Sequence, residues 1–290
     1  MADVWPVLIV IVRVAILVYV GLGVVLFFSE RSTVYLPDYP APSVFEECTA
    51  FGSGAEHIVY EGMRMHHKRL PVQAGASEGR VVVFYHGNAG SACDRAILAP
   101  VLERAGYSFI FVEYPGYAGP VRGKPPEVAG GGSRASNGAG DREGPSKTRI
   151  LAGVLTVQQF IEQEGYREVV LVGESIGVGV AGYHASLAKP DRLILISPHY
   201  ELADLAGWIG HLYPVRLLMR ENYTPGTWLK GVSVPTLLIE AEDDEIVPAW
   251  SADKLYTTIE SATRVELPGT HNALYENPEF YRSIERFLEY

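Results

Sequence analysis

The first hydrophobic run of the chain is long enough to cross a membrane. Residues 4–28 carry one charged side chain, Arg13, among apolar residues, and about 20 such residues span the bilayer core as a helix. A charge at the bilayer centre costs about 2.5 to 3.5 kcal/mol on insertion scales, which the surrounding Leu, Ile, Val and Phe side chains offset. The pattern predicts a transmembrane anchor over residues 1–28 that contacts the lipid bilayer through residues 4–28.

Two other interpretations of this run fit it less well. A cleaved signal peptide ends in a small-x-small site, whereas this run ends in Leu26, Phe27 and Phe28. A soluble helix of this length normally has a polar face. We therefore expect a single-pass membrane protein. The side of the membrane stays open, because Lys and Arg are sparse on both flanks of the run.

After the anchor, the pattern changes to short apolar runs that alternate with helical segments. Residues 29–55 are rich in proline and polar residues and are expected to form an extended tether, and residues 56–290 to fold as one domain. Paired short strands are expected over residues 57–69. The later runs are apolar and β-branched, as in a parallel sheet covered by helices on both faces. They comprise residues 81–85, 109–113, 169–172, 193–196, 236–239 and 265–267.

The segments between these strands predict helices and two interruptions. Helices are expected at about residues 94–105, 148–164, 176–188, 251–258 and 278–289. The insertion at residues 119–147 is dominated by Gly, Pro, Ser and charge and is expected to be a flexible surface loop. Residues 200–230 are apolar and aromatic and are expected to form either a cap over a site or an ordinary helix on the sheet. The fold class is therefore α/β.

Composition excludes one class of partner. With 48% hydrophobic and 20% charged residues, the 290-residue chain can bury a large core. Its net charge of −10 disfavours nucleic-acid binding, which requires Lys and Arg to neutralise phosphates. Cys48 and Cys93 are too few for a disulfide scaffold and lack the spacing of a metal-binding pair. They leave the redox compartment undecided, and no feature decides the oligomeric state.

The candidate chemistry begins at a serine. Residues Gly173-Glu174-Ser175-Ile176-Gly177 match the G-x-S-x-G nucleophile elbow, a tight strand-to-helix turn that presents a serine hydroxyl. Short motifs match by chance, but this one lies between the expected strand 169–172 and the expected helix 176–188. That junction is the context the elbow requires, so we predict that Ser175 is the nucleophile.

A serine nucleophile needs a base, and His271 is the candidate. A serine hydroxyl must lose its proton as it attacks, and in this elbow architecture the chain order is serine, acid, histidine. Only His271 lies downstream of the acidic cluster Glu240 to Glu245, which follows the expected strand 236–239. Several carboxylates of this cluster could orient the imidazole, and the cluster could instead be a solvated loop or a loose cation site.

Five segments together resemble the α/β-hydrolase superfamily and its Bem46-like, single-pass membrane-anchored branch: FYHGNAG, EYPGYAG, GESIG, EDDEIVP and GTHN. The resemblance covers about residues 80–290. It implies Asp244 as the acid, because Asp-x-x-Val-Pro at a strand end looks like the acid turn of these hydrolases, with Asp243 as the second choice. It also implies that the backbone N–H groups of Asn88 and Ile176 form the oxyanion hole. His86 is then structural.

The resemblance implies a serine hydrolase that cleaves a carboxylic ester or thioester through an acyl-enzyme, without a metal or organic cofactor. Membrane tethering suggests a lipid, or an acyl group carried on a protein, as the substrate. A peptidase on the same fold and a non-catalytic membrane-tethered binding protein stay open as alternatives, because fold does not fix function.

Overall fold

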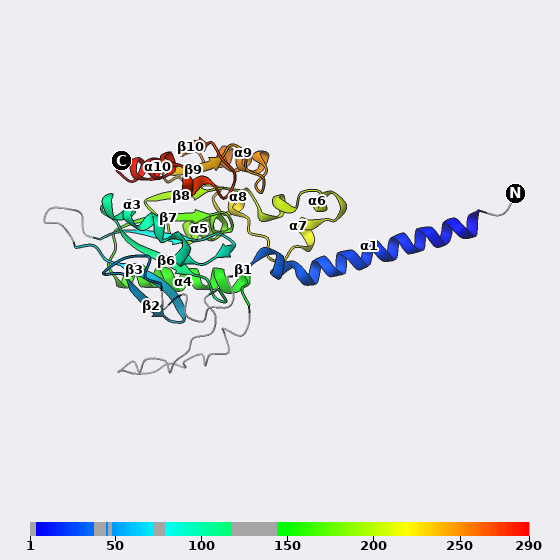
Figure 1. Cartoon of the computed structure of the whole chain (residues 1–290), viewed down its shortest axis with the longest axis horizontal. Coiled ribbons are helices and arrows are strands. Elements are labelled where there is room, and N and C mark those ends of the chain that lie inside the picture. Colours follow the sequence, from blue (N-terminus) through cyan, green and yellow to red (C-terminus); the bar gives the residue numbers. More distant parts are fainter. Residues whose placement is uncertain (1–3, 38–44, 46–47, 72–78, 118–143, 290) are drawn as a thin grey trace.

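The computed structural model describes residues 4–37, 45, 48–71, 79–117 and 144–289, and a sheet of eight strands forms its centre (Figure 1). In chain order these strands are β2 (Glu56–Tyr60), β3 (Met63–Lys68), β4 (Arg80–Tyr85), β6 (Ser108–Glu113), β7 (Glu168–Glu174), β8 (Arg192–Ile196), β9 (Thr236–Ala241) and β10 (Ala262–Leu267). Their order across the sheet is β10-β9-β8-β7-β4-β6-β3-β2. β3 pairs antiparallel with β2 and β6, and all other neighbours are parallel.

Helices cover both faces of this sheet. Alternate residues of β4 point to opposite faces, so Val81 and Val83 belong to one hydrophobic cluster, and Val82 and Phe84 to the other. The first cluster includes side chains of α4 (Lys147–Gln163), α5 (Ile176–Leu187) and α9 (Ala249–Thr258). The second includes those of η1 (Ala92–Leu98), α3 (Ala99–Arg104) and α10 (Pro278–Glu289). The expected α/β architecture, mostly parallel with helices on both faces, is confirmed.

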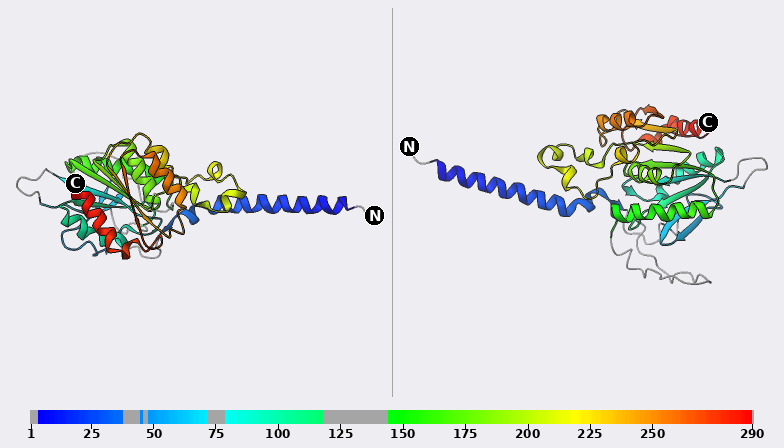
Figure 2. Two further views of the ribbon diagram at one scale, coloured as in Figure 1. Left: turned by 90° about the horizontal axis from the view of Figure 1, so that it is seen from above. Right: turned by 180° about the vertical axis from the view of Figure 1, so that it is seen from behind.

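The N-terminal helix α1 (Trp5–Val34) projects away from this α/β body (Figures 1 and 2). Its most apolar window has a mean hydropathy of 2.8, and none of that window is buried in the protein. At 30 residues, α1 is longer than the about 20 apolar residues that a membrane-spanning helix needs. By length and composition, α1 is a candidate membrane-spanning helix.

The chain just after residue 28 differs from the expected extended tether. α1 continues to Val34, and the short strand β1 (Leu36–Pro37) pairs parallel with β5 (Ala89–Gly90). The reason is tertiary contact: Glu30 is buried, and its carboxylate accepts a hydrogen bond from the backbone N–H of Glu221 at 2.7 Å. Much of the remaining expected tether, residues 38–44 and 46–47, lies outside the described residues, as does most of the 119–147 insertion.

The helix predicted over residues 94–105 is partly wrong, because its first part is not an α-helix. The segment expected to be helical over residues 94–105 is a 3₁₀ helix, η1, followed by the short α-helix α3. η1 begins earlier than expected because Ser91 and Asp94 form a capping box. α3 begins beside Pro100, whose fixed φ suits the first turn of a helix.

The segment 200–230 divides into two parts. Its short helices are η3 (Leu202–Ala206), α6 (Ile209–Leu212), α7 (Val215–Leu218) and α8 (Pro225–Trp228). α6 and α7 lie beside the body-proximal half of α1 (Figure 1), whereas α8 packs on α5. We call residues 202–219 the cap.

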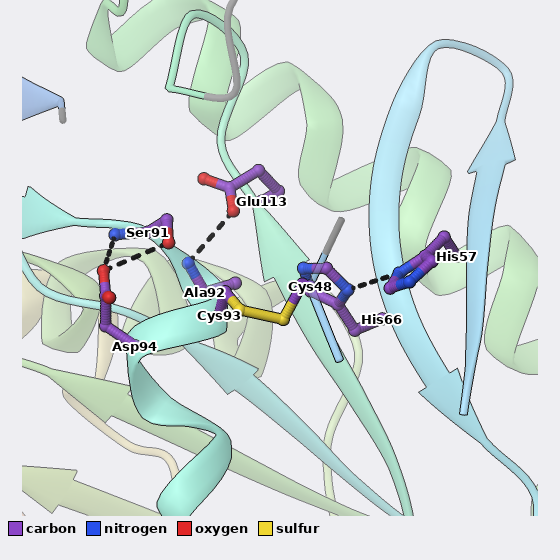
Figure 3. Close-up of a disulfide and its surroundings, with 8 residues drawn as sticks. All are labelled: Cys48, His57, His66, Ser91, Ala92, Cys93, Asp94 and Glu113. Atoms are coloured by element: carbon purple, nitrogen blue, oxygen red, sulfur yellow. Dashed lines mark hydrogen bonds between the residues drawn. A yellow bond between two sulfur atoms is a disulfide. The ribbon is translucent and has the colours of Figure 1, made fainter. Parts of the chain in front are cut away.

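A disulfide joins Cys48 to Cys93 (Figure 3). It links the segment that precedes β2 to the start of η1, where the backbone N–H of Ala92 also donates to Glu113 at 3.0 Å. The sequence separation is 45 residues, so the bond closes a long loop of the unfolded chain and stabilises the fold by about 3 to 4 kcal/mol on chain-entropy arguments. The sequence alone did not predict this pairing.

Candidate active site

Ser175 lies at the sharp turn between β7 and α5, in a strained backbone conformation. Its φ of 51° and ψ of −117° are unusual for a residue with a side chain. The turn closes only because its flanking residues are glycines. A Cβ on Gly173 would lie 2.4 Å from the carbonyl oxygen of Gly177, and a Cβ on Gly177 would lie 2.2 Å from that of Tyr85. The elbow geometry therefore follows from the motif.

His271 and Asp244 extend from Ser175 in a hydrogen-bonded line. The Nε2 atom of His271 lies 3.3 Å from the Ser175 Oγ, and its Nδ1 atom lies 2.8 Å from the Asp244 Oδ2. The three residues follow β7, β10 and β9, at the carboxyl ends of parallel strands, where ligands bind in open α/β sheets. The structure thus brings together the three residues that the sequence proposed as a triad.

Asp244 is the carboxylate of the acidic cluster that faces the imidazole. Burial would raise the pKa of Asp244, but hydrogen bonds from His271 and from the backbone N–H groups of Val247 and Ile246 outweigh it and hold the pKa below its usual value. Asp243 is exposed. Glu245 accepts a hydrogen bond from the His271 backbone N–H at 3.0 Å and so helps to fix the histidine loop. The geometry favours Asp244 over Asp243 as the acid.

The loop after β4 is arranged to present the backbone N–H of Asn88. The Nδ1 of buried His86 lies 2.8 Å from the carbonyl oxygen of Gly87, and since a carbonyl only accepts, Nδ1 carries the proton. That carbonyl shares a planar peptide group with the Asn88 N–H, so His86 fixes the orientation of this donor. Ile176 is the first residue of α5, where backbone N–H groups have no partner within the helix. Both residues line the same cavity as Ser175.

Glu174, inside the motif, connects three loops of the site. Its carboxylate accepts two hydrogen bonds from Arg95 of η1, at 2.6 and 2.8 Å, and one from the Tyr275 hydroxyl at 2.9 Å. Arg95 follows the oxyanion loop, and Tyr275 follows His271 in the chain. Glu174 lies inside the G-x-S-x-G motif, but its partners could not be predicted from the sequence, because they lie 79 and 101 residues away in the chain.

His199 is a second residue that the sequence did not single out. It is fully buried. Burial lowers the pKa of His199 to about 4, with Asp204 opposing the shift and His271 adding to it. His199 is therefore uncharged at neutral pH and places no positive charge near the His271 imidazole as that ring gains a proton.

Ser175 and His271 open into a largely apolar cavity of about 500 Å³. Its walls come from three places: the turn around Ser175 and Asn88, the cap, and α1. Leu26 and Phe27 of α1 and Leu202 and Met219 of the cap are among the lining residues. Within the described ranges, no group of three or more His, Cys, Asp or Glu side chains is placed to hold a metal ion.

Sequence comparisons find relatives of low identity to this chain. No protein-family model matches the chain. An uncharacterized protein of Mycobacterium tuberculosis is 29% identical over 95% of this chain and 93% of its own length. The lysophosphatidylserine lipase ABHD12 of Macaca fascicularis is 27% identical over 73% of this chain, and the match spans 56% of that lipase. The chain thus corresponds to about half the length of the lipase relatives.

Several solved structures share the fold of this chain. A predicted CIB-like hydrolase from Thermoplasma acidophilum matches 81% of this chain with a TM-score of 0.55 at 19% identity. Est1E of Butyrivibrio proteoclasticus, solved with ferulic acid, matches 81% with a TM-score of 0.57 at 15% identity. The predicted α/β-hydrolase fold is confirmed. These relatives do not carry the Bem46-like name, so membership of that branch stays a prediction.

Proposed function

We propose that this α/β-hydrolase is a membrane-bound serine esterase that cleaves the ester of a lipid with a single acyl chain, with Ser175, His271 and Asp244 as its catalytic triad. One observation carries the proposal: the hydrogen-bonded line from Asp244 through His271 to Ser175 ends at the mouth of an apolar cavity. The proposed nucleophile thus lies next to a cavity that can hold an apolar substrate.

The triad geometry supports a two-step acyl transfer. The Ser175 Oγ attacks the ester carbonyl while its proton passes to Nε2 of His271, and Asp244 stabilises the imidazolium. The backbone N–H groups of Asn88 and Ile176 hold the negative oxygen of the tetrahedral intermediate. Collapse of that intermediate breaks the ester bond, and the leaving alcohol takes the proton from His271. Water, deprotonated by the same imidazole, then releases the fatty acid and restores Ser175.

The surroundings of the triad favour a lipid ester over a small polar ester. The cavity is lined mostly by apolar side chains and lies next to a helix apolar enough to span a membrane. The ABHD12 relatives are named as lysophosphatidylserine lipases, which is consistent with a single acyl chain. A thioester would undergo the same two steps, so an acyl thioester is an informative second substrate.

The anchor and the disulfide support a membrane location with the catalytic part on an oxidising side. α1 spans the bilayer once in this proposal, with residues 4–28 in contact with lipid. Disulfides persist in oxidising compartments and are rare in reducing ones, and Cys48 and Cys93 are paired. The α/β body would therefore face the extracytoplasmic side. Mass spectrometry without reduction, on protein taken directly from membranes, would show free thiols if this assignment were wrong.

The direct test of the activity is fatty-acid release by the purified full chain in lipid nanodiscs. Substrates would be a lysophospholipid, a monoacylglycerol, a long-chain acyl thioester and a peptide amide. Ser175→Ala should lower ester hydrolysis by at least about 10⁴-fold. Ser186→Ala, at an exposed serine of α5 whose hydroxyl bonds only within its own helix, is the matched control and should retain it. Ester hydrolysis that survives Ser175→Ala would contradict the proposal, and so would preference for the amide.

A further inference from the structure

We propose that α1 is a wall of the substrate site as well as an anchor: the acyl chain of the lipid lies between α1 and the cap, with its ester carbonyl at Ser175. This inference rests on the proposed function and names where its substrate binds. It also implies a route, since a chain held against the membrane-spanning helix can enter from the bilayer without crossing water.

The cavity itself places α1 at the substrate. Its lining runs from Ser175 and His271 at one end to Gly23, Leu26 and Phe27 of α1. The volume of about 500 Å³ lies in the range of about 300 to 1,000 Å³ typical of small-ligand sites. Transfer of an acyl chain from lipid into an apolar cavity exchanges one apolar surrounding for another, so little solvation free energy opposes it.

Polar contacts at the body-proximal end hold α1 in a fixed position relative to Ser175. Glu221 is the centre of this junction: its side chain is 3% exposed, and it accepts hydrogen bonds from Arg31 at 2.9 Å and from the Tyr35 hydroxyl at 2.8 Å. Next along the chain, the backbone N–H of Leu36 donates to the carbonyl oxygen of Asn88 at 2.9 Å. The segment that leaves α1 is therefore bonded directly to the predicted oxyanion residue.

A second junction closes the far end of the cavity. The rings of Tyr19 in α1 and Tyr213 in the cap stack with centroids 4.5 Å apart. Each hydroxyl donates to a backbone carbonyl of the other element, Tyr19 to Leu212 at 2.6 Å and Tyr213 to Tyr19 at 2.8 Å. α1 is thus held by Tyr213 of the cap and by Glu221 just after the cap, and the residues of α1 that line the cavity lie between these two contacts.

The cap surface beside α1 fits the same lipid environment. Trp208 is 72% exposed and Leu217 is 85% exposed. Large apolar side chains exposed next to a membrane-spanning helix are stabilised by contact with lipid rather than with water. The open side of the cap would therefore lie at the bilayer surface, which is where a lipid with one acyl chain would approach the cavity.

Two glycines of α1 provide a matched pair of variants. A Cβ on Gly23 would lie 2.9 Å from the Tyr213 ring, whereas a Cβ on Gly21 has no atom of the described protein within 4 Å. Gly23→Leu therefore places a side chain at the cavity, and Gly21→Leu adds the same side chain where the structure leaves open space. Both leave the apolar character of α1 intact.

The experiment measures kcat/KM of the full chain in nanodiscs for 4-nitrophenyl butyrate and 4-nitrophenyl palmitate. Gly23→Leu should lower the palmitate-to-butyrate ratio at least about tenfold, the loss expected when about two methylene groups are shut out of an apolar site. Gly21→Leu should leave the ratio at the wild-type value. Ala206→Leu narrows the cavity from the cap side and should act as Gly23→Leu does, which keeps the test decisive should Gly23→Leu fail to fold.

Equal ratios in wild type, Gly23→Leu and Ala206→Leu would overturn this inference while leaving the esterase proposal intact. Failure of the proposed function has a different signature: folded wild type would cleave neither ester, and the acyl-chain site would be abandoned with it.

Discussion

The two sides of the cavity are held in different ways. On the sheet side, Ser175, Asp244 and His271 follow strands whose backbones are hydrogen-bonded to their neighbours. The side chains of β7 and β9 are mostly buried, whereas the edge strand β10 is buried only at Leu267. On the membrane side, α1 and the cap contain only helices and turns, and side-chain contacts such as Tyr19 to Tyr213 join them. Strand pairing holds the sheet side in one register, and catalysis requires accurate positions of the reacting groups. The membrane side depends on a few side-chain contacts outside the sheet.

The largest effect should follow from a change on the sheet side. Asp244→Asn replaces the carboxylate that holds the His271 imidazole, and the amide would favour the wrong tautomer. We expect kcat to fall by about 10⁴-fold for short-chain and long-chain esters alike, because both use the same imidazole. Asp243→Asn, one residue earlier and exposed, is the matched control and should stay within about twofold of wild type, as surface changes usually do.

Steady-state rates for 4-nitrophenyl butyrate and palmitate would check this expectation. A reversal, with Asp243→Asn more damaging than Asp244→Asn, would show that the acid had been assigned to the wrong residue.

A smaller effect should follow from a change on the membrane side. Glu221→Gln removes the buried charge that binds Arg31 and Tyr35 and should destabilise the junction by about 1 to 3 kcal/mol. Burial would raise the pKa of Glu221, but hydrogen bonds from the Lys147 backbone N–H, Arg31 and Tyr35 outweigh it and lower the pKa below its usual value. A carboxylate with a lowered pKa stabilises the folded state above its unfolded pKa of about 4.3 and loses that contribution as the pH falls through the folded value.

Thermal unfolding at pH 7 and at about pH 3 would measure this effect. The difference in unfolding temperature between wild type and Glu221→Gln should be largest at pH 7 and should become smaller in acid. Glu260→Gln, at an exposed carboxylate, provides the control and should show no gap at either pH. A gap that widened in acid would contradict the assignment of Glu221 as an ionised, bonded carboxylate.

The sheet side is also the part that the sequence predicted well. Strands β7 and β9 are mostly apolar runs, and the elbow needs glycine at 173 and 177 because a Cβ at either position would collide with backbone. Such requirements are local, so they are visible in a few adjacent residues. The same holds for the position of His271 after the last strand, which follows from chain order.

The membrane side could not be predicted in the same way, because its contacts join residues far apart in the chain. Glu30 and Glu221 are separated by 191 residues, and neither lies in a recognisable motif. The polar residues after Phe28 resembled the start of a tether, yet Glu30 is buried against Arg220 and Glu221, and the helix continues to Val34. The pairing of Cys48 with Cys93 and the bonds of Glu174 to Arg95 and Tyr275 were hidden for the same reason.

The most direct test of the account is covalent labelling of the full chain by a fluorophosphonate, with the modified residue located by peptide mass spectrometry. We expect one adduct, on Ser175, that is absent in Ser175→Ala and forms much more slowly in His271→Ala, since the imidazole must take the proton as the hydroxyl attacks. Folded wild-type protein that stays unlabelled, or that carries its adduct on another serine, would contradict it.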